Sequence, residues 1–244
     1  MVRPQGQVHA GLIRGPDQRK SGRDPEASNV LADSVVVSVC NPSGMGDPGW
    51  ALCYSCTLAG VPLLHQPTFE TARLILRPLK PSDATSIQTE ASAREIADTM
   101  ISLPHPYPAS EAERYLDEQR SLREQGRGVA FAIVTKAENR FCGLVEVRDI
   151  DREHSQAELS FWLAPKLWGQ GCMSEAVQAA LRYGFDELGL NRLYAYHMER
   201  NPASGRVLEK NGFRREGLLR QRVRKWDRYE DVVLWAIVRS DQAS

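Results

Sequence analysis

The chain has 244 residues, of which 42% are hydrophobic and 25% are charged. This composition is ordinary for a globular protein, and the length allows one domain with an appendage or two small domains. The 31 basic and 31 acidic residues cancel to a formal net charge of zero, so bulk charge points neither to nucleic acid nor to a membrane as partner. No apolar stretch is long enough to span a bilayer, and the first residues lack the apolar region of a signal peptide. We therefore expect a cytoplasmic protein that is a monomer or a homodimer.

The cysteines indicate a reducing compartment, because five thiols in a chain of this size do not form a paired disulfide framework. Cys53 and Cys56 form a single C-x-x-C pair with no second pair to complete a zinc site. We expect both to be free thiols and the protein to hold no metal.

Residues 1–66 differ from the rest of the chain, because they are rich in Gly, Pro, Ser, Asp and Arg and contain few aromatic residues. The run Asn41–Gly49 has a turn-forming residue at most positions. We expect a poorly structured N-terminal extension at 1–66, a folded domain at 67–239 and a short tail at 240–244. A natural tail or translation starting upstream of the natural domain would each give this extension.

The folded part alternates strand-like and helix-like segments. Arg73–Arg77 is strand-like and is closed by Pro78, and a helix is expected to open at Ser82 or Asp83. In chain order we then expect a helix at 110–125, strands at 129–135, 141–148 and 156–163, a helix at 174–188, a strand at 192–197, a helix at 203–211, and strands at 218–222 and 231–238. This succession predicts an α+β fold with a mostly antiparallel sheet and helices on both faces.

A glycine-bearing loop, Trp168–Gly171, runs directly into the helix expected after it. Glycines let the backbone approach a bulky anion, and the free amides of the loop and first helical turn point toward it. Ser174 suits an N-cap, and Glu175 suits the positive end of the helix. The loop therefore predicts a phosphate-binding site.

Two other interpretations of this loop exist. A helix start without a ligand is one, and a dinucleotide-binding turn is the other, with Glu199 as the ribose-binding acid. Against the dinucleotide turn, Ser174 replaces its third glycine, and Pro165–Trp168 separate the preceding strand from the loop. The chain that follows is also too short for a doubly wound domain.

Several segments together resemble the GNAT N-acetyltransferase superfamily, in particular its RimJ/RimL-type branch of ribosomal-protein N-terminal acetyltransferases. The segments that carry this resemblance are Thr71–Leu79 with Asp83, Ala157–Leu163, Trp168–Ala176, Asn201–Ser204 with Leu208–Phe213, and Glu216–Gly217 with Asp231–Leu234. They span about residues 68–239 and occur in the family's order. The resemblance implies a GNAT-type mixed sheet whose central strands, 156–163 and 192–197, splay apart.

The resemblance also implies a cofactor, acetyl-CoA, as co-substrate. Its pyrophosphate would lie on the amides of the glycine loop, and its pantetheine arm would pair with the strand 156–163, a form of strand addition. Met173 stands where the family commonly has Gly or Ala, so its side chain must point into the core for full affinity. The implied cofactor-binding residues are Trp162, Leu163, Trp168, Gly169, Gln170, Gly171, Cys172, Met173, Ser174, Asn201 and Ser204.

The chemistry needs a base for the amine and a group that stabilises the leaving thiolate. Many family members use a Tyr for the second task, but Leu208 occupies that position here. The resemblance makes Ser204 the substitute, although Ser204 and Asn201 also suit the start of a helix. Glu158 and Glu146 are the candidate bases, and each is equally consistent with a strand carboxylate paired to an Arg.

His197 is a third candidate for the base, although a lone His at a strand end is more often structural. The basic stretch between Arg214 and Arg228 suits a CoA phosphate, an acidic protein substrate or ribosomal RNA, or it is the solvated face of a hairpin.

We expect an enzyme that moves an acetyl group from acetyl-CoA to a primary amine within a ternary complex. The resemblance favours a protein N-terminal α-amine as acceptor. The alternatives are a small-molecule amine, such as a polyamine or an aminoglycoside, and a non-catalytic acyl-CoA-binding module. Neither a membrane nor a nucleic acid is expected as partner.

Overall fold

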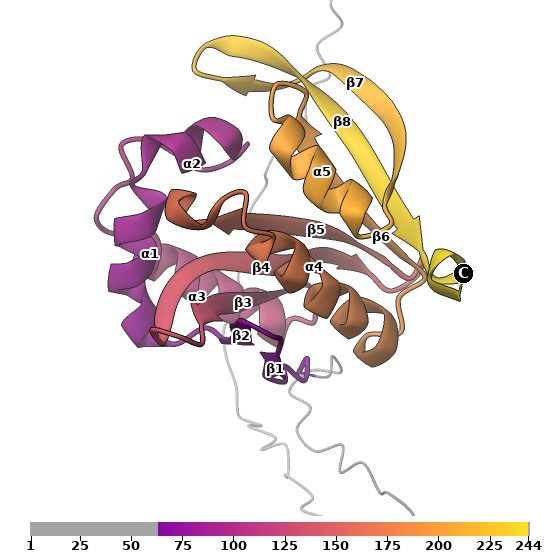
Figure 1. Cartoon of the computed structure of the whole chain (residues 1–244), viewed down its shortest axis with the longest axis horizontal. Coiled ribbons are helices and arrows are strands. Elements are labelled where there is room, and N and C mark those ends of the chain that lie inside the picture. The colour runs from indigo at the N-terminus through magenta and orange to yellow at the C-terminus, as the bar shows by residue number, and fades with distance from the viewer. Residues whose placement is uncertain (1–62, 244) are drawn as a thin grey trace, which may run out of the picture. The chain divides into compact units, whose positions relative to one another are not determined.

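A computed structural model describes residues 63–243 of the chain. The N-terminal extension up to residue 62, and with it the Cys53–Cys56 pair, lies outside the described residues. A mixed sheet in the strand order β1-β2-β3-β4-β5-β6-β8-β7 is the centre of the domain (Figure 1). Its strands are β1 Phe69–Glu70, β2 Leu74–Pro78, β3 Val129–Thr135, β4 Arg140–Asp151, β5 Gln156–Leu163, β6 Arg192–Met198, β7 Arg214–Lys225 and β8 Arg228–Val238.

Helices cover both faces of this sheet, as the sequence predicts for an α+β fold. One face carries α4 and α5, and the opposite face carries α1, α2 and α3 (Figure 1). The helices are α1 Ala84–Ala91, α2 Arg94–Thr99, α3 Glu111–Glu124, α4 Cys172–Arg182 and α5 Pro202–Lys210, and α4 continues into a π-helical turn at Tyr183–Glu187. The predicted α+β fold class is confirmed.

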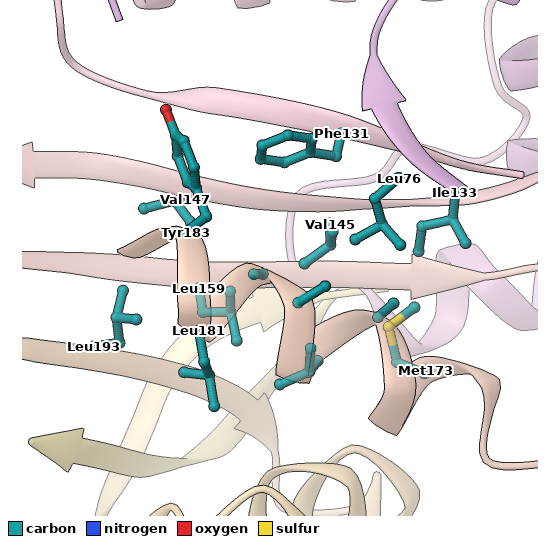
Figure 2. Packing of buried hydrophobic residues seen from close by; sticks show 14 of the residues in the cluster. Leu76, Phe131, Ile133, Val145, Val147, Leu159, Met173, Leu181, Tyr183 and Leu193 are labelled. Carbon is teal, nitrogen blue, oxygen red and sulfur yellow. The ribbon is translucent and has the colours of Figure 1, made fainter. Parts of the chain in front are cut away.

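The central strand β3 shows why the sheet is buried on both sides. Phe131 and Ile133 point into the larger core beneath α4, and Ala132 and Val134 point into the smaller core beneath the α1–α3 layer. Successive side chains of a strand alternate between faces, so a strand covered on both sides reads as a continuous apolar run. Figure 2 shows the larger core, in which Tyr183 and Phe131 meet edge to face with ring centroids 5.1 Å apart.

The strands β5 and β6 are the one parallel pair of this sheet, and they separate along their length. Only three residue pairs join them, from Gln156 and Arg192 to Glu158 and Tyr194. β5 continues to Leu163 and β6 to Met198 without further pairing to each other. The splayed central strands that the resemblance implies are therefore present, and they open a gap in the middle of the sheet.

The structure differs from the sequence prediction in several local elements. β7 is a 12-residue strand rather than a segment limited to 218–222, and β1 and α2 were not predicted. The helix expected at 174–188 begins two residues earlier, at Cys172. At the end of the domain, Arg239–Ala243 forms a short 3₁₀ turn, and Asp241 accepts a hydrogen bond from the Val238 amide over 3.1 Å.

Residues 63–66, which the sequence analysis assigned to the extension, include side chains packed against the domain. Leu64 is buried in the larger core. The Tyr183 hydroxyl donates to the carbonyl of His65 over 2.7 Å, and the Gln66 amide donates to the carbonyl of Ala130, also over 2.7 Å.

Candidate active site

The glycine loop before α4 has the backbone geometry that its sequence predicts. Gly169 and Gly171 have φ angles of 74° and 79°, in the left-handed region where glycine has no Cβ to clash. Gly171 is the N-cap, and its carbonyl accepts the amide of Glu175 over 3.1 Å. The prediction of Ser174 as N-cap is wrong, because the helix starts at Cys172 and Ser174 lies within its first turn.

The start of α4 offers backbone hydrogen-bond donors. The first turn of an α-helix leaves its amides without intrahelical acceptors, here those of Cys172, Met173 and Ser174. The helix dipole adds a positive potential at the same end. A helix start of this kind has the chemistry of an anion site.

An ion pair between Arg73 and Glu175 fixes the loop to the start of β2. Arg73 Nε donates to Glu175 over 2.9 Å, and Arg73 Nη1 donates to the carbonyl of Gln170 over 2.8 Å. Thr71 donates its hydroxyl proton to the same carboxylate. Burial alone would raise the pKa of Glu175, but the hydrogen bonds from Thr71 and Arg73 outweigh it and hold the pKa below its usual value.

Trp168 connects the loop to the end of β5. Its indole N–H donates to the carbonyl of Leu163 over 2.7 Å, while 44% of the residue stays exposed. The Ala164 amide donates to Cys142 on β4 over 2.7 Å, so the Leu163 amide, one residue earlier, points away from β4. A free backbone donor therefore faces the gap at Leu163.

A cleft of about 210 Å³ follows this gap between the glycine loop and α5. Most of the predicted cofactor-binding residues line it, namely Trp162, Leu163, Trp168, Gly169, Gly171, Met173, Ser174, Asn201 and Ser204. Gln170 and Cys172 are not among its lining residues. We call this cavity the loop cleft.

Met173 and Cys172 contribute mainly to packing. Both are buried, and Figure 2 shows Met173 among the core side chains beneath the sheet. The larger residue at position 173 is thus accommodated by the core, although Met173 also reaches the wall of the loop cleft.

Asn201 and Ser204 stand at the first turn of α5. Asn201 is the N-cap, and its side-chain oxygen accepts the Ser204 amide over 3.4 Å. Its side-chain nitrogen donates to Oγ of Ser204 over 2.9 Å. Leu208, at the position where many family members have Tyr, is fully buried and supplies no polar group.

A second cavity of about 200 Å³ adjoins the loop cleft, and residues of β5, β6 and β7 contribute to its lining. It shares four lining residues with the loop cleft, namely Thr99, Met100, Phe161 and Ser204. Its charged lining residues are Glu158, Arg148 and Arg222, and Tyr196 and Ser160 also line it. We call this cavity the acceptor cavity, because it holds the candidate base.

Glu158 lies within the acceptor cavity, on β5 beside Arg148 of β4. Its Oε1 is 3.9 Å from Arg148 Nε. Burial raises the pKa of Glu158 above its usual value, and the charge of Arg148 offsets this effect only in part. A carboxyl group with a raised pKa is suited to proton exchange with an amine.

Glu146 is placed differently, since it lines neither cavity. Its carboxylate accepts a hydrogen bond from the hydroxyl of Tyr115 on α3. Burial, the largest effect, raises the pKa of Glu146, and the Tyr115 hydrogen bond opposes that rise. This contact ties Glu146 to the α3 layer.

His197 lines the acceptor cavity, but both of its ring nitrogens have partners. The indole N–H of Trp235 donates to Nε2 over 2.9 Å, which leaves Nδ1 as the donor to the Met198 carbonyl at 2.8 Å. Burial lowers the pKa of His197, so the ring stays neutral. A Cβ at Gly205 would lie 2.9 Å from Nε2, so His197 sets how closely α5 packs on β6.

Comparison with known proteins identifies the family of this fold. The family model described as the acetyltransferase (GNAT) domain matches residues 73–214. The chain belongs to the GNAT acetyltransferase family. The matched range includes both splayed strands, the glycine loop and α5. It also includes the contacts of Arg73 with Glu175 and Gln170, which we call the Arg73 clamp.

Relatives of this GNAT protein are named as N-acetyltransferases. The uncharacterized N-acetyltransferase p20 of Bacillus licheniformis is 31% identical over 176 residues, which cover 72% of this chain and 98% of the relative. The ribosomal-protein-serine acetyltransferase of Escherichia coli is 32% identical over 116 residues, covering 48% of this chain and 65% of the relative. The chain is accordingly an N-acetyltransferase, and a ribosomal-protein acetyltransferase is among its relatives, as the resemblance indicated.

A solved structure extends this comparison to a second acceptor class. Spermidine N-acetyltransferase from Vibrio cholerae, in complex with CoA and spermine, matches this GNAT fold with a TM-score of 0.63 and 27% identity. The match covers 71% of this chain and all of that chain. The relatives therefore differ in the amine that they acetylate.

Sequence reasoning missed three parts of this GNAT site. The Arg73 clamp joins residues that are 102 positions apart, and Arg206 and Lys210 add positive charge to the wall of the loop cleft. Arg222 lines the acceptor cavity, although the sequence placed it only within a basic stretch. Arg206 and Lys210 could have been found from the sequence, because residues four apart lie on the same side of a helix.

Among residues 63–243, no group of three or more His, Cys, Asp or Glu side chains is arranged to hold a metal ion. Within the same residues, no helix has the length and apolar character needed to cross a membrane.

Proposed function

We propose that this enzyme transfers the acetyl group of acetyl-CoA to a protein N-terminal α-amine by direct attack within a ternary complex. The observation that carries the proposal is the meeting of the two cavities at Ser204 and Phe161. One cavity offers anion-binding amides, and the other offers a carboxylate whose pKa is raised. A donor and an acceptor entering from opposite sides would meet between the splayed strands.

The loop cleft fits the chemistry of CoA. Free amides at the start of α4 suit the pyrophosphate, and Arg206 and Lys210 add positive charge along the cleft. The unpaired edge of β5 suits the amide groups of a pantetheine arm. The Leu163 amide would donate to the thioester carbonyl, where such a donor contributes about 3 kcal/mol to transition-state stabilisation.

The acceptor cavity supplies the proton transfer. Glu158, directly or through a water molecule, accepts a proton from the amine as its nitrogen bonds to the acetyl carbon. The carbon–sulfur bond then breaks and leaves the CoA thiolate. Ser204 donates a hydrogen bond to that thiolate, which takes its proton from solvent because a thiol is a stronger acid than a serine hydroxyl.

A small-molecule amine is the second candidate acceptor, because the chain is similar to a spermidine N-acetyltransferase. Residues 67–239 are proposed as the catalytic domain, with the N-terminal extension outside it.

Thiol release from acetyl-CoA, measured on the full chain with peptide, polyamine and aminoglycoside acceptors, tests this proposal. Thermal stabilisation by CoA on the same sample separates binding from turnover, because a ligand that binds only the native state raises the melting temperature. We expect stabilisation by CoA and thiol release that depends on a peptide acceptor. Stabilisation without release for any peptide would refute the proposed acceptor, and the absence of both stabilisation and release would also refute the binding of acetyl-CoA.

A matched pair of glycine variants locates the CoA site in this assay. Gly171→Ala places a Cβ at a φ of 79° in the loop, and Gly189→Ala places one at 68° after α4, outside both cavities. Both substitutions strain the backbone, but only Gly171→Ala should reduce the stabilisation by CoA. An equal loss for both variants would remove the glycine loop from the binding site.

A further inference from the structure

The charges that line the acceptor cavity do not favour the binding of a polycation. Two guanidinium groups, Arg148 and Arg222, line it together with one carboxylate, Glu158. A polyamine carries several positive charges and no negative one, so two arginines in the cavity would oppose its binding. The cavity therefore suits an amine with a nearby negative charge.

A bulge in β7 delivers Arg222 to this cavity. Leu219 pairs with Val232 and Val223 pairs with Glu230, so three residues of β7 stand opposite the single residue Asp231. Such bulges redirect side chains and are frequent beside active sites. The register of β7 against β8 therefore shifts at the residues that line the cavity.

The middle residue of this bulge has a costly backbone conformation. Gln221 has a φ of 50°, a left-handed value that is uncommon for residues other than glycine. Its amide donates to Asp231 Oδ1 over 2.7 Å, which holds the bulge in place. Strained backbone persists where the surrounding structure supports it, and such positions cluster at functional sites.

Arg222 also has its charge available. Among residues 63–243, no carboxylate lies within ion-pair distance of Arg222, whereas Arg224 on the same strand pairs with Asp227 at 2.8 Å. Arg148 is partly neutralised, with Asp149 at 3.3 Å and Glu158 at 3.9 Å. Arg222 is exposed and therefore free to bind an anion that enters the cavity.

We propose that the acceptor is a primary amine that carries a carboxylate close to the reacting nitrogen, and that Arg222 binds this carboxylate. The inference rests on the proposed acetyl transfer and names the class of acceptor. Glu158 takes the proton of the amine, and the planar guanidinium of Arg222, which lines the same cavity, suits the carboxylate. An acidic side chain beside a protein N-terminus and a free amino acid both have this chemistry.

Three peptides that differ at one position test the charge preference. They begin with Ser-Glu, Ser-Gln or Ser-Lys and are otherwise identical, and glutamate and spermidine extend the panel to small amines. We expect kcat/KM to be roughly tenfold higher for the Glu peptide than for the Gln peptide, since a charge-assisted hydrogen bond is worth about this ratio. The Lys peptide and spermidine should be poorer still. Equal rates for the three peptides, or a preference for spermidine, would overturn the inference.

Substitution of Arg222 assigns the preference to this residue. Arg222→Gln should abolish the ratio of kcat/KM between the Glu and Gln peptides, and Arg222→Glu should reverse the order of the Glu and Lys peptides. Arg220→Gln is the matched control, because Arg220 lies in the same bulge but lines neither cavity. A preference that survives in Arg222→Gln would contradict the proposal.

Binding to the CoA-loaded protein separates this inference from the proposed reaction. If no amine is acetylated, the proposed function fails, but calorimetric binding of the Glu peptide still reports on Arg222. Binding that favours the Glu peptide in the wild type and not in Arg222→Gln supports the charge recognition alone. Equal binding of all three peptides refutes it. A direct comparison of the binding of glutamate with that of the Glu peptide distinguishes a free amino acid from a peptide as the acceptor.

Discussion

The side-chain nitrogen of Asn201 donates to Oγ of Ser204 over 2.9 Å, in the first turn of α5 where the two cavities meet. This bond occupies an acceptor site of the Ser204 oxygen and leaves the hydroxyl proton free to be donated. The helix cap and the proposed thiolate contact are therefore compatible, because the cap uses the oxygen and the contact uses the proton.

Ser204→Ala tests this arrangement. We expect kcat to fall about tenfold to a hundredfold, because the leaving thiolate loses a hydrogen-bond donor, while KM for acetyl-CoA changes little. Steady-state kinetics of thiol release measure both parameters. Ser204→Thr keeps a hydroxyl group and should recover much of the rate, whereas equal losses in the two variants would indicate a packing role.

Glu158→Gln tests the base. The substitution should lower kcat/KM by about a hundredfold or more, since general-base catalysis typically contributes at least that factor. Glu146→Gln is the matched control on the neighbouring strand, and its effect on kcat/KM should stay within a few fold. A larger loss in Glu146→Gln than in Glu158→Gln would exchange the two assignments.

The pH dependence of the wild-type enzyme gives a second test of Glu158. Burial raises the pKa of its carboxyl group, opposed by Arg148 and Arg222 and assisted by Asp149 and Glu146. A base must be deprotonated, so kcat/KM should fall as pH drops through a value above the usual range of a glutamate. A profile that stays flat down to pH 4.5, the ordinary value, would contradict this role.

Arg73→Ala tests the clamp on the glycine loop. The loss of its bonds to Glu175 and Gln170 should loosen the loop and raise KM for acetyl-CoA several-fold, with a small change in kcat. Arg140→Ala is a suitable control, because Arg140 forms an exposed ion pair with Glu90 away from both cavities. The same increase of KM in both variants would mean that the clamp has no specific part in binding.

Asp83→Asn tests stability rather than activity. Asp83 is buried and accepts two hydrogen bonds of 2.8 Å from Arg77, and its loss should lower the free energy of unfolding by about 2 kcal/mol. Burial raises the pKa of Asp83, but the bonds from Arg77 and the Lys80 amide outweigh this and lower it below 3.8.

The lowered pKa of Asp83 determines how its contribution to the free energy of unfolding changes with pH. The contribution of the carboxylate is fully present above its unfolded-state pKa of about 3.8 and is lost as pH falls through the lower value of the folded state. Urea unfolding at several pH values should therefore show the wild type and Asp83→Asn converging in strong acid. A constant difference down to pH 2 would indicate a loss of packing instead.

The sequence revealed those parts of the site that depend on local backbone requirements. Gly169 and Gly171 were predictable as the turn that leads into α4, because their positive φ angles demand glycine. The prediction of Ser174 as the N-cap was wrong, because the left-handed Gly171 is the N-cap and its carbonyl accepts the first helical hydrogen bond. Cap preference is a statistical signal, and the turn geometry overrode it.

Other parts depend on contacts between distant segments and left no local pattern. The Arg73–Glu175 pair is set by the packing of β2 against α4, which no spacing in the chain reveals. The length of β7 was underestimated from the sequence. Its arginines are exposed, so the strand lacks the alternation of buried and exposed residues that marks a strand. Its bulge at Gln221 consequently could not be located from the sequence.

The most direct test of the proposed function is mass spectrometry of a Ser-Glu peptide after incubation with the full chain and acetyl-CoA. We predict a single acetyl group on the α-amine of the peptide, formed at a rate that Glu158→Gln reduces strongly. An unmodified peptide from a protein that CoA stabilises would contradict the assignment of acetyl transfer to this amine. Acetylation that proceeds equally well in Glu158→Gln would contradict the proposed base.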